Sequence, residues 1–203
     1  MLADFAVVLD ANVLAESALG DLFLRLSEEP RLLLPKWTET ILEETERTLV
    51  QTLGWAPGVA ASRLAAMREW FPEAMIEDYE PFIAQCRNDE RDRHVLAAAI
   101  REGVETIVTM NAKHFRPEHL EPWGVNASHP DAYLRVLFDH DAGAVVQALN
   151  GMAQARRKPL AQLLSRLSQP APDFAAHVAG SLAIDLPRYD KEAYRSSQEH
   201  GSP

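Results

Sequence analysis

The sequence lacks the features of a secreted or membrane-embedded protein. It has a single cysteine, Cys86, so no internal disulfide can form. No window approaches the ~18 uninterrupted apolar residues that a membrane-spanning helix requires. The first residues have no basic segment, and an acid lies within their short apolar run, so they do not fit a signal peptide. We therefore expect a cytoplasmic protein without a membrane partner.

The excess of acidic residues is confined to one part of the chain. The net charge is −10; residues 1–135 hold 13 Lys and Arg against 23 Asp and Glu, and residues 136–203 hold 7 of each. An acidic balance argues at first against a nucleic-acid partner. However, an enzyme that binds divalent cations needs carboxylates in one place. Many cytoplasmic proteins are acidic for solubility alone, and composition by itself favours that simpler interpretation.

The first two thirds of the chain alternate short apolar runs with helical patterns. Buried strands are predicted at residues 5–9, 32–34 and 106–109, with weaker ones at 74–76 and near Val125. Helices are predicted at residues 11–29, 38–53, 58–71, 79–87 and from about 88 to 103. This alternation is typical of an α/β fold with a parallel sheet, in which ligands sit at the carboxyl ends of the strands.

The strand signals stop near Pro130. About three helices are predicted over residues 131–184, with breaks near 139–143 and 168–172. The last residues are polar, and we expect them to be poorly ordered. The expected organisation is an α/β domain over residues 1–135, a helical extension over 136–185 and a flexible tail over 186–203.

Two polar residues follow the first predicted strand. Asp10 ends the run Val-Val-Leu-Asp, so its carboxylate projects into the crevice at the end of the sheet, where it could hold a cation. It could instead cap the next helix. Asn12 could orient a substrate, and a capping or loop-holding role is equally compatible with the sequence.

Three further acids lie on predicted helices. Glu44 borders the sheet-facing side of its helix, whereas most of its acidic neighbours point to water. Asp89 and Asp92 are three residues apart at a helix start and therefore share one face. The positive end of the helix favours their ionised form, which metal ligands require. The simpler alternative is that all three are solvated surface acids.

A last polar residue, Asn111, follows the predicted strand 106–109 by two positions. Its amide would face the same crevice as Asp10 if the two strands are neighbours; alternatively, it serves as a turn residue. The histidines show none of the paired spacings of a zinc site, and the chain has no cysteine cluster.

Taken together, these four segments resemble the PIN-domain family, and in particular the VapC-like toxins of type II toxin–antitoxin pairs. The resemblance covers about residues 4–135 and rests on the order and spacing of the motifs Val-Val-Leu-Asp10-Ala-Asn12-Val-Leu, Glu44-Thr-Glu-Arg-Thr-Leu, Asp89-Glu-Arg-Asp92-Arg-His-Val-Leu and Ile-Val-Thr-Met-Asn111-Ala-Lys-His-Phe. It implies that residues 1–135 form a three-layer α/β/α PIN nuclease domain with a parallel sheet. It also implies Mg²⁺ or Mn²⁺ at a carboxylate cluster and hydrolysis of RNA phosphodiester bonds.

The matched positions suggest a role for each residue. Asp10, Glu44 and Asp92 resemble the metal-binding catalytic acids, and Asp89 resembles a helper ligand. The last catalytic position is often Asp in the family and is Asn111 here. An amide binds a cation more weakly, so Asn111 would contact a metal-bound water.

The resemblance also implies partners. These are RNA, a cognate antitoxin protein and, as is common in such families, a second copy of the chain. Arg93 and Lys113 flank the acids, and with Asn12 they are the expected substrate contacts. A basic step at residues 156–158 could extend the RNA contact, or it could be a solvated helix end.

A catalytically silent PIN module that acts as an RNA-binding or scaffold protein is the main alternative, because the sequence alone does not show that the acids converge. A haloacid-dehalogenase-like phosphatase needs an acid where Asn12 stands. A receiver domain needs a cluster of acids near the first strand, which Asp10 alone does not supply.

Overall fold

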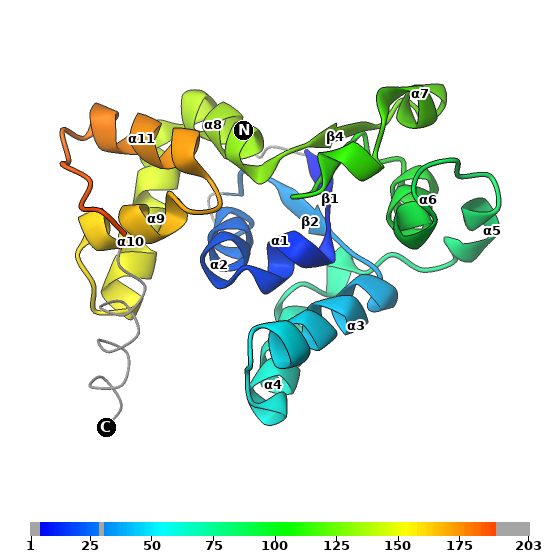
Figure 1. Ribbon diagram of the computed structural model, residues 1–203, viewed down its shortest axis with the longest axis horizontal. Helices are drawn as coiled ribbons and strands as arrows, with labels where there is room; N and C mark the ends of the chain where they lie inside the picture. The colour runs from blue at the N-terminus through cyan, green and yellow to red at the C-terminus, as the bar shows by residue number, and fades with distance from the viewer. Residues whose placement is uncertain (1–4, 29–30, 190–203) are drawn as a thin grey trace.

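The computed structural model describes residues 5–28 and 31–189. Its centre is a four-stranded parallel sheet in the order β2-β1-β3-β4 (Figure 1). The strands are β1 (Ala6–Leu9), β2 (Leu34–Lys36), β3 (Thr106–Val108) and β4 (Asn126–Ser128). β1 therefore lies between β2 and β3, and the residues that follow β1 and β3 emerge side by side at the carboxyl edge of the sheet.

Helices cover both sides of this sheet. α1 and α2 lie on one side and α6 on the other, which gives the three-layer α/β/α arrangement expected of a PIN fold (Figure 1). The helices of this part are α1 (Ala11–Ala15), α2 (Ser17–Leu26), α3 (Glu39–Arg47), α4 (Pro57–Trp70), α5 (Glu80–Ile83), α6 (Arg93–Glu102) and α7 (Pro117–Leu120). Short turns complete it: the π-helix η1 (Thr48–Thr52) and the 3-10 turns η2 (Pro72–Ala74), η3 (Glu90–Asp92), η4 (Ala112–His114) and η5 (Glu121–Trp123).

β1 is apolar along its whole length because helices cover both of its faces. Val7, Val8 and Leu9 are fully buried although successive side chains point to opposite sides. The predicted α/β class with a parallel sheet is confirmed. The strand predicted at residues 74–76 is reduced to an isolated bridge between Trp37 and Met75.

The helix predicted over residues 11–29 is divided at Glu16. The backbone of Glu16 is extended, with φ −72° and ψ 106°, and its carboxylate accepts the N–H groups of Ala18 and Leu19, each at 3.0 Å. Glu16 thus caps α2 instead of continuing α1. A glutamate favours helix interiors by propensity, so this break could not be predicted from the sequence.

The second strand is displaced toward the C-terminus from its predicted place at residues 32–34. It contains Pro35, which pairs with Val7. Proline has no N–H to donate to a neighbouring strand, and β2 is the edge strand of the sheet, where such a donor is not required.

Four helices follow β4: α8 (Pro130–His140), α9 (Ala142–Ala155), α10 (Leu160–Leu167) and α11 (Pro172–Ser181). They gather at one end of the molecule (Figure 1). The sequence predicted about three, and the additional break lies between α9 and α10, where Arg157 has a positive φ of 50°. α8 crosses residue 135, so the predicted division between residues 1–135 and 136–185 falls within a helix and remains a prediction.

The helical extension is anchored to α2 by two ion pairs. Arg166 of α10 pairs with Glu16, and Arg156 pairs with Asp21 at 2.9 Å. Arg156, which the sequence offered as an RNA contact or a solvated helix end, therefore packs against α2. Of the tail predicted to be flexible, 186–203, the residues from 190 onward lie outside the described residues. Within the described ranges, no helix is both long and apolar enough to cross a membrane.

Candidate active site

Asp10 is held at the carboxyl edge of the sheet by two donors. The hydroxyl of Thr109 and the side-chain amide of Asn12 each donate a 2.6 Å hydrogen bond to its Oδ2. The same amide lies 3.2 Å from the Thr109 hydroxyl. The backbone N–H of Asp10 donates to Val108, the last residue of β3. The adjacency of β1 and β3 therefore fixes the position and orientation of this carboxylate.

The same network shapes the loop after β3. The backbone N–H of Met110 donates to the side-chain oxygen of Asn12 at 2.9 Å, and that of Asn111 donates to the Thr109 hydroxyl at 3.0 Å. Asn12 therefore ties the loop after β1 to the loop after β3, which was one of its two expected roles. Its role as a substrate contact stays a prediction.

The charge of Asp10 is only partly compensated. Its side chain is 3% exposed, and burial is the main cause that raises its pKa above the ordinary value. The hydrogen bond from Thr109 lowers the pKa, and the negative charge of Asp92 raises it again. Asp92 thus lies close enough to Asp10 for the two carboxylates to repel each other. A divalent cation at this place would offset both the burial and the repulsion.

Asp92 belongs to a compact group with Asp89 and His114. One ligand atom of each lies within 4.8 Å of the others, and Nδ1 of His114 is 2.8 Å from Oδ2 of Asp92. Asp89 caps the turn η3 by accepting the N–H of Arg91, and its own N–H donates to the carbonyl of His114. The structure therefore brings Asp89 and Asp92 together, as their spacing predicted.

Glu44 approaches from α3. Its Oε2 lies 3.3 Å from Nε2 of His94, which follows Asp92 by two residues. This contact places Glu44 beside the start of α6. Asp10 and Glu44 lie outside the tight group of Asp89, Asp92 and His114. Their part in a common metal site stays a prediction.

Asn111 begins the turn η4. Its φ is −112°, and its carbonyl accepts the N–H of His114 at 2.9 Å. A positive φ is thus not the reason for an asparagine at this position. This bond involves only the backbone, and the Asn111 side chain makes no capping hydrogen bond to η4, so its expected contact with a metal-bound water stays a prediction.

Three residues of the site were not singled out from the sequence: Thr109, His114 and His94. Thr109 was predicted only as the last residue of a strand. Its hydrogen bond to Asp10 could not be predicted, because it depends on which strands are neighbours in the sheet. The histidines were considered only as zinc ligands. His114 lies within the motif Met-Asn-Ala-Lys-His-Phe, three residues after Asn111, and this proximity was the available signal.

A hollow of about 430 Å³ lies beside the acids. We call it the basic hollow and define it by its lining residues Arg87, Asn88, Asp89, Lys113, His114, Arg116 and His119. Lys113, an expected substrate contact, is among them. Arg93 is not: its Nε donates to the backbone carbonyl of Asn88 at 3.4 Å.

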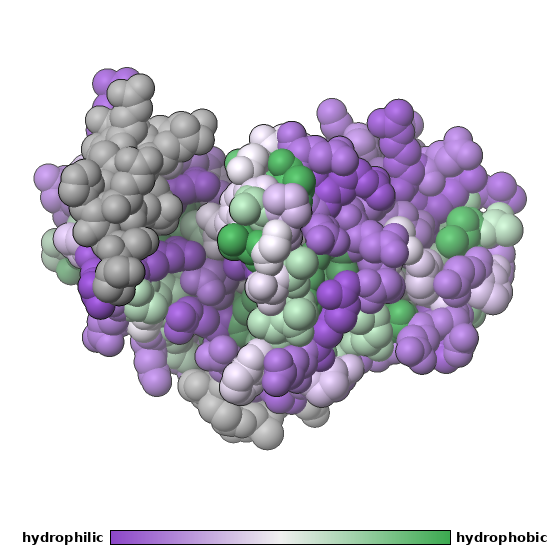
Figure 2. Space-filling model, turned by 90° about the horizontal axis from the view of Figure 1, so that it is seen from below, coloured by the Kyte–Doolittle hydropathy of each residue, from purple (hydrophilic) through white to green (hydrophobic). Residues whose placement is uncertain are grey.

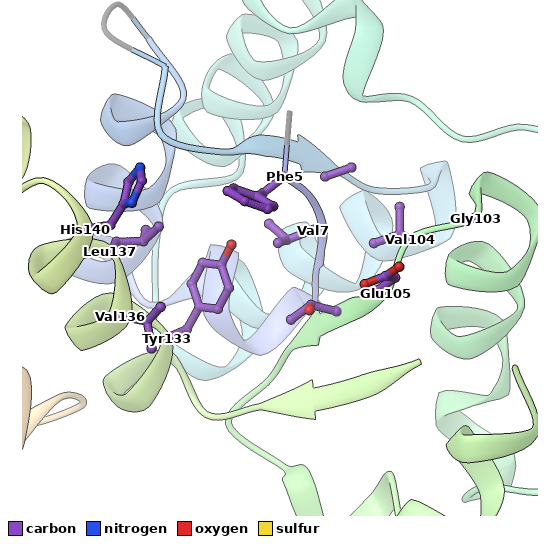
Figure 3. Close-up of a pocket in the computed structure, with 11 residues that line it drawn as sticks. Phe5, Val7, Gly103, Val104, Glu105, Tyr133, Val136, Leu137 and His140 are labelled. Carbon is purple, nitrogen blue, oxygen red and sulfur yellow. The ribbon is translucent and has the colours of Figure 1, made fainter. Parts of the chain in front are cut away.

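A larger hollow, of about 520 Å³, lies at the opposite edge of the sheet (Figure 3). Phe5, Val7, Tyr133, Val136 and Leu137 give it a mainly apolar lining, and burial raises the pKa of Tyr133 to about 12. It contains no cluster of acids. The chemically equipped site is therefore the smaller one, at the carboxyl edge.

Comparison with known proteins found a partial match. No family model matches the chain, and no solved structure matches it. A protein of Mycobacterium tuberculosis (strain ATCC 25618 / H37Rv) named "Putative ribonuclease VapC50" is 42% identical over 101 residues. The match covers 48% of this chain and 60% of that relative. It confirms the resemblance to VapC-like proteins that the motifs predicted.

Proposed function

We propose that this chain, a relative of the VapC-type ribonucleases, is a Mg²⁺- or Mn²⁺-dependent endoribonuclease that hydrolyses RNA phosphodiester bonds. The observation that carries the proposal is the buried carboxylate of Asp10, which Thr109 and Asn12 fix at the carboxyl edge of the sheet. The name of the relative, a ribonuclease, supports the same class of reaction.

The side chains at the site fit a hard divalent cation. Asp10, Asp92 and Glu44 are the proposed ligands, with Asp89 as a helper. Carboxylate oxygens suit Mg²⁺ and Mn²⁺ better than softer metals. His114 is bonded to Asp92 at 2.8 Å, so we assign it the task of orienting that carboxylate. Thr109 does the same for Asp10.

When bound, the cation would supply an activated water and neutralise charge on the scissile phosphate. The protein's own residues prepare the place for this chemistry. Thr109 and Asn12 prevent rotation of the Asp10 carboxylate, since both of their bonds end on the same oxygen. The turn η4 follows Asn111 and carries Lys113 and His114. Lys113 is proposed to hold a phosphate of the substrate, as is Arg93 from α6.

A cleavage assay on total RNA tests the proposal. Wild type should cleave with Mg²⁺ or Mn²⁺ and lose activity in EDTA. Asp92→Asn should reduce the cleavage rate at least about 100-fold, as expected when a metal ligand is lost, while the circular dichroism spectrum is unchanged. RNA binding without metal-dependent cleavage would instead indicate a silent PIN module.

We further propose that the protein acts in the cytoplasm as the toxin of a type II pair, with a cognate antitoxin as its partner. Three large apolar side chains on or beside α4 are exposed, namely Leu53, Val59 and Trp70. Figure 2 shows apolar residues in the middle of a face with largely hydrophilic flanks. Contiguous exposed apolar patches often mark protein contacts, and we propose that these residues belong to one. A second copy of the chain is the other proposed partner.

Expression in bacteria tests the toxin proposal. Wild type should arrest growth, and co-expression of a small neighbouring gene should relieve the arrest. Asp10→Asn should not arrest growth at an equal protein level. Arrest that persists in this variant would contradict toxicity based on RNA cleavage.

A further inference from the structure

We propose that the basic hollow binds one ribonucleotide unit of the substrate, through the phosphate next to the one that is cleaved. The inference rests on the proposed function and extends it from the reacting phosphate to its neighbour. Three kinds of observation carry it: the charge of the lining, its unpartnered polar atoms and its contact with the acid cluster.

The charge of the lining favours an anion. Arg87, Lys113 and Arg116 contribute three positive charges, and Asp89 is the only acid in the lining. Among the described residues, Arg87 and Lys113 make no ion pair, and Arg116 makes only a loose one, at 3.8 Å, with the exposed Glu118. In a chain with a net charge of −10, these cations are therefore not used to neutralise nearby acids. They are available to a phosphate.

The side-chain oxygen of one lining residue, Asn88, favours a nucleotide over a simple phosphate ion. Asn88 is 3% exposed; its amide nitrogen donates to the carbonyl of Asp92, but its oxygen has no partner within the described ranges. Nδ1 of His119 is also buried without a partner there. Buried polar atoms are normally satisfied. The Asn88 oxygen needs a donor, which a ribose hydroxyl offers and an unprotonated phosphate does not.

The hollow adjoins the acid cluster directly. Asp89 and His114 line the hollow and also belong to the group whose ligand atoms lie within 4.8 Å of Asp92. With the scissile phosphate at the proposed metal ligands, a nucleotide in the hollow lies beside it. The volume of about 430 Å³ lies within the range of small-ligand sites, about 300–1,000 Å³.

The lining contains no phenylalanine, tyrosine or tryptophan. Stacking of a base on such rings is the usual means by which proteins hold unpaired bases. The hollow therefore recognises the backbone of single-stranded RNA and tolerates different bases at this position.

A scan with neutral linkages tests the inference. Short single-stranded RNAs, each with one methylphosphonate in place of a phosphate, are titrated against the full chain in EDTA, with binding followed by fluorescence anisotropy. One neutral linkage, adjacent to the bond cleaved in Mg²⁺, should weaken binding to wild type about tenfold, as expected for one charge-assisted contact. Arg87→Ala/Lys113→Ala should bind the unmodified RNA about tenfold less tightly and should be insensitive to that linkage.

The control variant removes two arginines elsewhere. Arg101→Ala/Arg135→Ala has the same change in charge, and Arg101 lies eight residues along α6 from Arg93, about 12 Å by helix rise. It should keep the wild-type sensitivity to the neutral linkage. All four substituted positions are exposed, so the variants should keep the wild-type melting temperature.

The outcomes separate this inference from the proposed function. If RNA is cleaved but wild type and Arg87→Ala/Lys113→Ala respond equally to every neutral linkage, the inference is overturned and the nuclease proposal stands. If one neutral linkage weakens binding to wild type but not to Arg87→Ala/Lys113→Ala, and no metal supports cleavage, the hollow binds RNA and the nuclease proposal fails. If a DNA strand of the same sequence binds as tightly and shows the same effect of the neutral linkage, the proposed recognition of ribose is overturned.

Discussion

The hydroxyl of Thr109 and the carboxylate of Asp10 are joined by a 2.6 Å hydrogen bond, although the two residues are 99 positions apart. The bond crosses from β3 to β1 at the carboxyl edge of the sheet. Thr109 is fully buried and also accepts the backbone N–H of Asn111. One hydroxyl thus orients a proposed metal ligand and the loop that carries the rest of the site.

Replacing this hydroxyl should impair the site without unfolding the protein. Thr109→Val keeps the shape of the side chain and removes the donor, so we expect metal affinity and RNA cleavage to fall by about 10–100-fold. Mn²⁺ titration by calorimetry and a cleavage assay measure the two effects. Thr109→Ser retains the hydroxyl and is the matched control. Equal losses in both variants would show that packing, and not the hydrogen bond, is what matters.

Neutralising Asp10 should stabilise the metal-free protein. Burial and Asp92 raise the pKa of Asp10, so between its ordinary value and the raised one the folded state holds a proton that the unfolded state has released. The free energy of unfolding therefore falls as the pH rises through this window. At pH 7 in EDTA, Asp10→Asn should be more stable than wild type by about 0.5–2 kcal/mol, typical of relieving active-site strain.

Urea unfolding at several pH values checks this prediction. The difference between Asp10→Asn and wild type should shrink as the pH falls below the ordinary aspartate range. Mg²⁺ or Mn²⁺ should stabilise wild type and leave Asp10→Asn almost unchanged. A variant that is less stable than wild type in EDTA at pH 7 would contradict the electrostatic interpretation.

The ion pairs between α2 and the helical extension should contribute to stability. Arg156 and Arg166 are less than one quarter exposed. Ion pairs of this intermediate burial stabilise a protein more than exposed pairs do. Replacing both arginines by Ala should therefore lower the free energy of unfolding by about 1–3 kcal/mol. Urea unfolding measures this cost. Arg135→Ala, an exposed site on α8, is the control and should change stability by less than about 0.5 kcal/mol. A loss no larger than that of the control would mean that apolar packing alone anchors the extension.

Cys86 should be unreactive in the folded protein. It is fully buried, and burial raises the pKa of its thiol to about 11, with Arg93 acting in the opposite direction. At pH 8 a thiol reagent such as DTNB should not modify the native protein and should react with one equivalent after unfolding in guanidinium. Because the folded state keeps this proton longer, stability should fall as the pH rises from about 9 to about 11. Fast reaction of native protein would contradict the burial.

The sequence predicted the acids but not the groups that hold them. Asp10 and Asp92 could be singled out because one follows a buried strand, the other precedes an apolar helix, and both match the order of the PIN motifs, although each position also suits an ordinary helix start. Thr109 and His114 could not, because their roles depend on contacts between distant segments. Glu16 shows a different reason for a wrong prediction. Its helix propensity favours a continuous helix, whereas in the structure its carboxylate caps α2 and also accepts a hydrogen bond from Arg166, which is 150 residues away in the sequence.

The sheet illustrates the same division between local and long-range information. β1 was predictable because helices on both faces require an unbroken apolar run, and β3 because β-branched residues favour strands. The predicted position of β2 was wrong because a proline usually ends a strand, so Pro35 was placed after it. Pro35 lies within β2 at the edge of the sheet, where its missing N–H costs no hydrogen bond. The number of helices after Pro130 depended on the break between α9 and α10, where Arg157 has a left-handed backbone and Pro159 precedes α10; Pro159 was the available signal in the sequence.

The path of α8 decides how the protein can be shortened. This helix runs from Pro130 to His140, with Leu134 buried before residue 135 and Leu137 and Phe138 buried after it. A fragment that stops at residue 135 would retain half a helix and expose the apolar surface that the other half covers, so its aggregation would say nothing about RNA or antitoxin binding. Truncation experiments should therefore cut ahead of Pro130, at the turn where His129 caps the helix, or leave α8 whole.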